Sequence, residues 1–318
     1  QAGDRAARLT SKMLAQELGI AARHVLPAST GVIGAPLPTQ SIVHAIPSLR
    51  ASLSSTGWKA FSRAILTTDQ GPKIAARTFS IDSRPCTMLG VAKGAGMIHP
   101  NMATTLAFVV TDVTAPSAVL QKALKDAARH TFNAISVDGD TSTNDMILLM
   151  ASGASGARPV SATGRVYHHV VQALEQVLGE LATAIVADGE GAEHTVRMTV
   201  TGLASESTCR RVAEALARSV LVKTALHGRD SNWGRLLMAA GNSGEPFDMD
   251  QVAIRIAGVP VVRAGVSLGK AAEQRAARAM KQSSYDIELQ LGRASHRASY
   301  LTCDLGHAYV RINADYRS

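Results

Sequence analysis

Cysteines, aromatic residues and long apolar runs are all scarce in this chain of 318 residues. Its three cysteines lie far apart with no CxxC pair, which argues against a disulfide framework and a thiolate zinc site and favours a reducing compartment. No apolar run approaches the roughly 18–20 residues of a membrane-spanning helix, and the first residues do not resemble a secretory signal. We therefore expect a cytoplasmic protein with no membrane partner and no metal site.

Charge is unbalanced but not clustered. Lys and Arg number 33 against 25 Asp and Glu, a net charge of +8, yet no run of five basic residues occurs. Nucleic-acid binding needs positive charge gathered on one face, and aromatic side chains to stack on bases make up only 4% of the chain. We expect no nucleic-acid partner, and an affinity for small acidic molecules fits the charge equally well.

The chain has the composition of an ordinary globular protein, with 46% apolar and 18% charged residues. Patterns of helices and strands alternate along it, which predicts an α/β or α+β fold. A strand-like stretch covers residues 77–92, a long helix covers 166–187, and three strand-like stretches end the chain. The glycine cluster beside Glu190 is the best domain boundary, and it divides the chain into 1–190 and 191–318.

The segment from Lys93 to Thr105 has an unusual composition. Glycine and alanine at 94–96, a proline and two threonines precede the very apolar strand expected at 105–110. Glycines let backbone approach a ligand closely, and a threonine at the mouth of a buried strand is held rigidly, as a nucleophile must be. A plain glycine-rich turn that caps a strand is the alternative on these residues alone.

The sequence Lys-Gly-Ala-Gly-Met-Ile-His-Pro-Asn-Met-Ala-Thr at 93–104 resembles the signature of a known enzyme family. This family is the self-cleaving glutamate N-acetyltransferases, or ornithine acetyltransferases, of arginine biosynthesis. Further blocks resemble the family in the family's order: 28–34, 67–69 with Lys73, 138–145, 188–192, 223–228 with 232–235, and 309–313. Several blocks in order make the resemblance specific over the whole chain.

The resemblance implies a four-layer α/β/β/α sandwich that contains a self-cleavage site, with a smaller C-terminal α/β domain. The chain would cut itself between Ala103 and Thr104, and Thr104 would become the N-terminal acyl-transfer nucleophile. Its own α-amine, with an ordinary pKa of about 7.7–8.0, would be the general base. By resemblance, the Thr30 hydroxyl and the Gly31 backbone N–H form the oxyanion hole.

The resemblance also implies the substrates and the residues that hold them. N-acetylornithine donates the acetyl group and glutamate accepts it, with contacts from Thr67, Lys93, Thr104 itself, Glu190, Asn313 and Ser318. No cofactor is implied, and whether acetyl-CoA is a second donor stays open. The family suggests α and β chains from one precursor, assembled as a heterotetramer of two αβ pairs.

Several alternatives remain at this stage. A self-processing amidohydrolase or aminopeptidase of related architecture would use water as the acceptor, and a non-catalytic binding protein comes last. Asp138 and Asp140 fit a hydrogen-bonded turn better than a catalytic carboxylate pair, and His227 fits a structural loop better than a catalytic base. Family members normally carry a further sheet-forming segment before the position of Gln1, so the sequence suggests a fragment.

Overall fold

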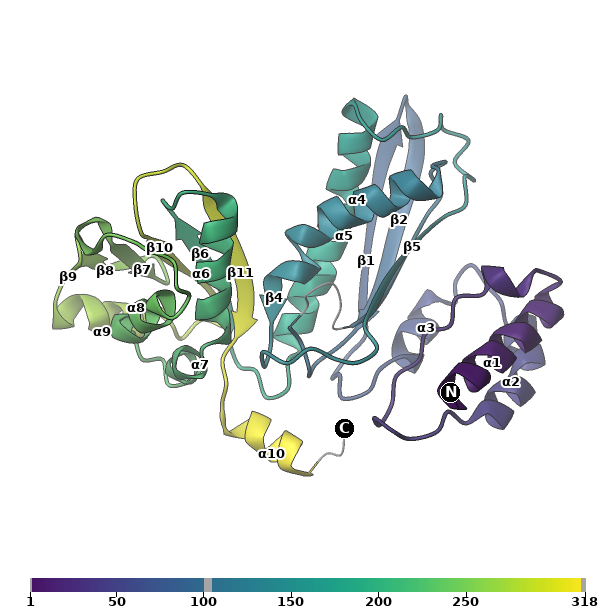
Figure 1. The fold of residues 1–318 in the computed structure, drawn as a ribbon, viewed down its shortest axis with the longest axis horizontal. Coiled ribbons are helices and arrows are strands. Elements are labelled where there is room, and N and C mark those ends of the chain that lie inside the picture. Colours follow the sequence, from purple (N-terminus) through teal and green to yellow (C-terminus); the bar gives the residue numbers. More distant parts are fainter. Residues whose placement is uncertain (1, 100–104, 316–318) are drawn as a thin grey trace.

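Two β-sheets, each with its own helices, make up the computed structural model, which describes residues 2–99 and 105–315 (Figure 1). The first sheet has four strands in the order β1-β2-β3-β5, and the second has seven in the order β4-β11-β6-β10-β7-β8-β9. Each sheet has its own cluster of buried apolar side chains. The mixed α/β class that the sequence predicts is confirmed.

The first sheet lies between residues 73 and 151. Its strands are β1 (Lys73–Ile81), β2 (Arg84–Lys93), β3 (Leu106–Thr111) and β5 (Met146–Ala151). The single strand-like stretch expected at 77–92 is in fact a hairpin, in which β1 pairs antiparallel with β2. Asp82 and Ser83 both have positive φ, 48° and 66°, as a two-residue type I′ turn requires. Asp82 and Ser83 are themselves turn-forming residues, with Pro85 close behind, so the sequence carried a signal for this turn that the single strand prediction overlooked.

Two helices cover one face of this sheet. Helix α5 (Arg165–Ala187) packs on β1 and β2, and α4 (Ser117–Arg129) packs on α5 and β5. By length and composition α5 could cross a membrane, but its Leu174, Val177 and Leu181 are fully buried against the sheet. We assign it as a core helix, whose C-terminal end delivers the glycine-rich turn at 188–192.

The second sheet comes almost entirely from the C-terminal half of the chain. Its strands are β4 (Ile135–Ser136), β6 (Thr195–Thr201), β7 (Ala253–Ile256), β8 (Val259–Arg263), β9 (Val266–Ser267), β10 (Ser284–Gln290) and β11 (Arg297–Cys303). The helices beside it are α6 (Glu206–Arg218), α7 (Val220–His227), α8 (Trp233–Gly241) and α9 (Lys270–Ala279). Strand β4 crosses from the first half and pairs parallel with β11, so the turn after β4 begins where the two sheets meet.

Two helical segments extend from this body. At the N-terminus α1 (Ala2–Leu18) packs on α2 (Thr39–Ala51), and α3 (Trp58–Ala64) reaches β1 and β2. At the other end α10 (His307–Asp315) follows β11 and lies below the junction of the sheets (Figure 1). A strand was expected last, and that prediction is wrong. Val310 and Ile312 alternate as in a strand, but both are exposed on the helix.

Candidate functional site

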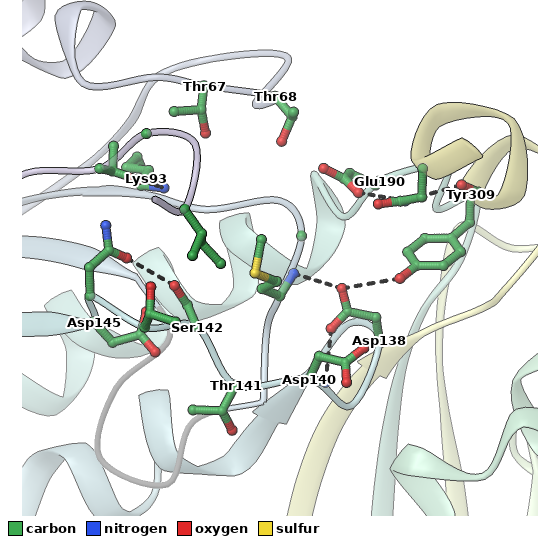
Figure 2. A pocket seen from close by; sticks show the side chains of 18 residues that line it. Thr67, Thr68, Lys93, Asp138, Asp140, Thr141, Ser142, Asp145, Glu190 and Tyr309 are labelled. Atoms are coloured by element: carbon green, nitrogen blue, oxygen red, sulfur yellow. Dashed lines mark hydrogen bonds between the residues drawn. The ribbon is translucent and has the colours of Figure 1, made fainter. Parts of the chain in front are cut away.

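One cavity of about 320 Å³ lies at the junction of the two sheets (Figure 2). All the site residues that the sequence analysis named within the described ranges line it, although they come from five separate segments of the chain. They are Thr30, Gly31, Thr67, Lys93, Glu190 and Asn313. The other candidates, Ala103, Thr104 and Ser318, lie outside the described residues. Figure 2 places Lys93 on one side of the cavity and Glu190 on the opposite side.

Lys93 ends strand β2 and is the one basic side chain among the described residues that line the cavity. Its Nζ lies 3.4 Å from Oγ1 of Thr30 and donates to it. Burial lowers the pKa of the Lys93 ammonium, while the negative charges of Asp69 and Asp145 oppose that change. The side chain of Thr105, directly before β3, donates to the Lys93 carbonyl oxygen, so the start of β3 lies beside Lys93.

Behind the cavity, a buried ion pair network joins three segments. The Lys73 ammonium lies 2.6 Å from Asp69 Oδ1 and 2.5 Å from Asp188 Oδ2. Asp69 also accepts hydrogen bonds from the backbone N–H groups of Gly94, at 2.6 Å, and Thr67, at 3.2 Å. Burial raises the pKa of Asp69, but Lys73 and the backbone donors outweigh burial and hold this pKa below its ordinary value.

Members of this network lie one or two positions along the chain from three residues that line the cavity. Asp69 follows Thr67, Gly94 follows Lys93, and Asp188 precedes Glu190. The loop after α3, the end of β2 and the end of α5 are therefore fixed to one another by charge. Lys73 itself is 4% exposed and fully engaged, so Lys93 rather than Lys73 faces the cavity.

Glu190 is held where two glycines allow close packing. Its backbone N–H donates to the Ala95 carbonyl at 2.9 Å, and its Oε2 accepts from Asn313 Nδ2 at 2.8 Å. A Cβ at Gly96 would stand 2.6 Å from the Glu190 carboxyl carbon. A Cβ at Gly191, where φ is +72°, would stand 2.4 Å from the backbone nitrogen of Tyr309 in α10. Any larger residue at either position would displace Glu190 or α10.

Asp138, directly after β4, is a structural carboxylate at the edge of the cavity. It accepts from the backbone N–H groups of Met97, at 2.7 Å, and Ile98, at 2.9 Å, and from the Tyr309 hydroxyl at 3.4 Å. The Asp140 N–H also donates to it at 3.2 Å, which agrees with the hydrogen-bonded turn that the sequence favoured. Burial raises the pKa of Asp138 despite these backbone hydrogen bonds.

The rest of this turn reaches two more segments, whereas the sequence predicted only a hydrogen-bonded turn here. The Thr141 hydroxyl donates to the His99 carbonyl at 2.9 Å. Ser142 Oγ donates to Asn144 Oδ1 at 2.9 Å, and Asn144 Nδ2 donates to the Ser29 carbonyl at 2.6 Å. The signals in the sequence were the density of short hydrogen-bonding side chains between 138 and 145 and the resemblance of this block to the family.

Neither histidine that could have been a catalytic base lines the cavity. His99 Nε2 lies 3.1 Å from Glu214 Oε1, and His227 Nδ1 lies 2.7 Å from Asp304 Oδ2. His227 belongs to α7 and packs against the backbone of Gly306. Within residues 2–99 and 105–315, no group of three or more His, Cys, Asp or Glu side chains is arranged to hold a metal ion.

A small cavity between two sheets that is lined by hydroxyls, several carboxylates and a lysine is suited to small charged molecules, as in enzymes that act on them. The family model described as "ArgJ family" matches residues 1–318. The chain therefore belongs to the ArgJ family, and the resemblance to the acetyltransferases of arginine biosynthesis is confirmed.

Individual relatives agree with this assignment. An "Arginine biosynthesis bifunctional protein ArgJ" from Methylococcus capsulatus is 46% identical over 98% of this chain and 77% of its own length. The protein of the same name from Chlorobaculum tepidum is 44% identical over 100% of this chain and 78% of its own. The crystal structure of the arginine biosynthesis bifunctional protein ArgJ from Bacillus halodurans is also similar, with a TM-score of 0.63 and 36% sequence identity. The match covers 66% of this chain and 98% of that one.

The Lys73 network gives a prediction about stability. Lys73→Met leaves Asp69 and Asp188 without their shared cation, and breaking a buried ion pair typically costs about 3–5 kcal/mol of unfolding free energy. Because the folded Asp69 pKa is lowered, its contribution is present above the ordinary aspartate pKa of about 3.9 and is lost as pH falls through the folded value. The difference between wild type and variant should therefore shrink in acid, as urea unfolding across pH would measure.

Arg158→Met is the control, since Arg158 forms an exposed ion pair with Asp82 at 2.5 Å. We expect it to leave stability nearly unchanged. If Lys73→Met unfolded like Arg158→Met at neutral pH, the network would not hold the segments together.

Proposed function

We propose that this chain transfers the acetyl group of N2-acetyl-L-ornithine to L-glutamate, after cutting itself between Ala103 and Thr104. The observation that carries the proposal is the convergence of Thr30, Lys93 and Glu190 on one cavity. The resemblance named these residues one by one, from blocks far apart in the sequence. Family membership supports acetyl transfer as the chemistry.

The proposed reaction has two half-reactions on one nucleophile. Thr104 Oγ attacks the acetyl carbonyl, the amide C–N bond breaks, and ornithine leaves with the proton taken from the hydroxyl. The α-amine of glutamate then attacks the acetyl ester, N-acetylglutamate leaves, and the proton returns to Thr104 Oγ. The threonine α-amine carries the proton in both steps, since its ordinary pKa of about 7.7–8.0 is close to working pH.

The oxyanion of each tetrahedral intermediate needs hydrogen-bond donors fixed in advance. In the proposal these are the Thr30 hydroxyl and the Gly31 N–H. The contact with Lys93 supports this role, because the ammonium donates to Thr30 Oγ1 and leaves the threonine proton available for the oxyanion. The same lysine places positive charge beside the developing negative charge.

The charges in the cavity suit an amino-acid substrate. In the proposal Lys93 attracts the substrate carboxylate, Thr67 adds a hydroxyl, and Glu190 on the opposite side attracts an ammonium group. Asn313 holds the Glu190 carboxylate by the 2.8 Å hydrogen bond from α10. Ser318 keeps the contact role that the resemblance implies, as part of this proposal.

Three further points belong to the proposal. The relatives' name includes the word "bifunctional", which supports acetyl-CoA as a second acetyl donor. A heterotetramer of two αβ pairs and a cytoplasmic location follow from the resemblance. Light scattering on the cleaved protein tests the assembly.

The products distinguish a transferase from a self-processing hydrolase. We expect cleaved protein incubated with N-acetylornithine and glutamate to yield N-acetylglutamate and ornithine, as measured by mass spectrometry. Without glutamate, only about one acetyl group per site should transfer, giving a burst of ornithine without sustained turnover. Sustained release of free acetate, with or without glutamate, would instead identify the hydrolase.

Self-cleavage gives a second prediction. Thr104→Ala should leave one uncut chain, because the hydroxyl that attacks the preceding carbonyl is gone. Thr104→Ser keeps a hydroxyl and should cleave more slowly. Intact-mass spectra would show pieces that cover 1–103 and 104–318 for wild type and Ser, and one species for Ala. Cleavage of the alanine variant at 103–104 would refute the mechanism.

The base gives a third prediction, about pH. If the Thr104 α-amine is the base, kcat/KM should rise with pH through one deprotonation near or somewhat below pH 7.7–8.0. His99→Gln and His227→Gln should keep this profile, since the two histidines pair with Glu214 and Asp304. A folded, cleaved histidine variant that no longer forms the acyl-enzyme would make that histidine the base.

A further inference from the structure

The stretch that carries Thr30 and Gly31 has no regular structure of its own. It lies between the short 3₁₀ turn Ala22–His24 and helix α2, and residues 26–36 are all exposed. The helices on either side are held to the body mainly through the packing of α3 on β1 and β2. Burial therefore cannot fix the place of Thr30 and Gly31, so specific polar contacts must do so.

One such contact comes from the turn 138–145. Asn144 Nδ2 donates to the carbonyl of Ser29, the residue directly before Thr30, at 2.6 Å. Lys93 reaches the Thr30 hydroxyl as well, at the longer distance of 3.4 Å. The bond from Asn144 is to the backbone, so it fixes the peptide that leads into the Thr30–Gly31 segment rather than a side chain alone.

The orientation of the Asn144 amide is itself determined. An amide presents an oxygen that accepts and a nitrogen that donates, and the two ends differ only in how they are hydrogen-bonded. The Ser29 carbonyl can only accept, so Nδ2 faces it, and Ser142 Oγ donates to Oδ1 at 2.9 Å and holds the amide in this orientation. Asn144 also lies two residues before β5, which begins at Met146 in the first sheet.

We propose that Asn144, oriented by Ser142, is a positioning residue that holds the Thr30–Gly31 oxyanion segment over the catalytic cavity. The inference rests on the proposed acetyl transfer. Asn144 lines the cavity, but its role is carried out through the Ser29 carbonyl and not through contact with substrate. A misplacement of catalytic groups by about 1 Å can cost about 10²-fold in rate, so one hydrogen bond of this kind suffices to matter.

Asn144→Leu tests the proposal, because leucine has nearly the shape of asparagine but can neither donate nor accept a hydrogen bond. We expect kcat to fall by about 10²-fold with KM within about threefold, since an oxyanion hole acts mainly on the transition state. The control is Asn242→Leu, which makes the same change after α8 and should keep wild-type kcat and KM. Ser142→Ala removes the hydrogen bond to Oδ1 but keeps the one to Ser29, and should give a smaller fall in kcat.

A double-mutant cycle with Thr30→Ala separates positioning from any other role. Thr30→Ala alone should lower kcat by about 10²–10³-fold. Adding Asn144→Leu to that variant should then cost at most a few-fold, because the segment that Asn144 holds has already lost its donor. Cleavage, checked by intact mass, and thermal stability are measured on every variant, and kcat is normalised to cleaved protein.

Three outcomes would overturn the inference. They are a tenfold rise in KM at unchanged kcat, full additivity with Thr30→Ala, and wild-type kinetics in Asn144→Leu. If Asn144→Leu did not cleave or fold, the cycle between Ser142→Ala and Thr30→Ala would decide by the same criterion. A wild-type protein without transferase activity would instead refute the proposed function.

Discussion

The arrangement of the site depends on the buried ammonium of Lys73 between Asp69 and Asp188. Removing three charges from water costs several kcal/mol per ion, so such a network persists only where every member is fully hydrogen-bonded. Asp69 meets this condition with the N–H groups of Gly94 and Thr67 in addition to Lys73. Because a partly satisfied network is costly, there is one favourable placement for the three segments, and it is the placement that brings Thr67, Lys93 and Glu190 to one cavity.

Two segments outside the Lys73 network complete the cavity, and each is held by a few polar contacts. The exposed stretch with Thr30 and Gly31 is tied by Asn144 and Lys93, and α10 is tied through Asn313 to Glu190 and through Tyr309 to Asp138. Neither segment contributes to the two buried apolar clusters. Hydrogen bonds rather than hydrophobic packing therefore set the positions of the groups proposed to contact the oxyanion and the far end of the substrate.

The sequence predicted the mixed α/β class and named residues that line one cavity, but it did not predict what holds them there. Lys93, Glu190 and Asn313 could be named from ordered blocks, since a block preserves residue identity. The contact between Lys73 and Asp188 joins residues 115 positions apart, and no local pattern encodes such a pairing. The strand expected last became α10 because alternating Val310 and Ile312 indicate a strand only where one face is buried, and here both are exposed.

In the proposed reaction a single cavity serves both half-reactions, so it must accept a cationic ornithine side chain and an anionic glutamate side chain. The part that both substrates share, an α-carboxylate, would lie against Lys93, whose charge is kept in place by β2. Much of the surrounding acidity is already engaged within the protein: Asp69 pairs with Lys73, and Asp138 accepts hydrogen bonds from the N–H groups of Met97 and Ile98. Asp140 is exposed, where water and salt screen its charge. In the proposal, the fixed charge of Lys93 meets the α-carboxylate that both substrates share. The acidic groups nearby are already hydrogen-bonded or screened, so the cavity accepts two side chains of opposite charge.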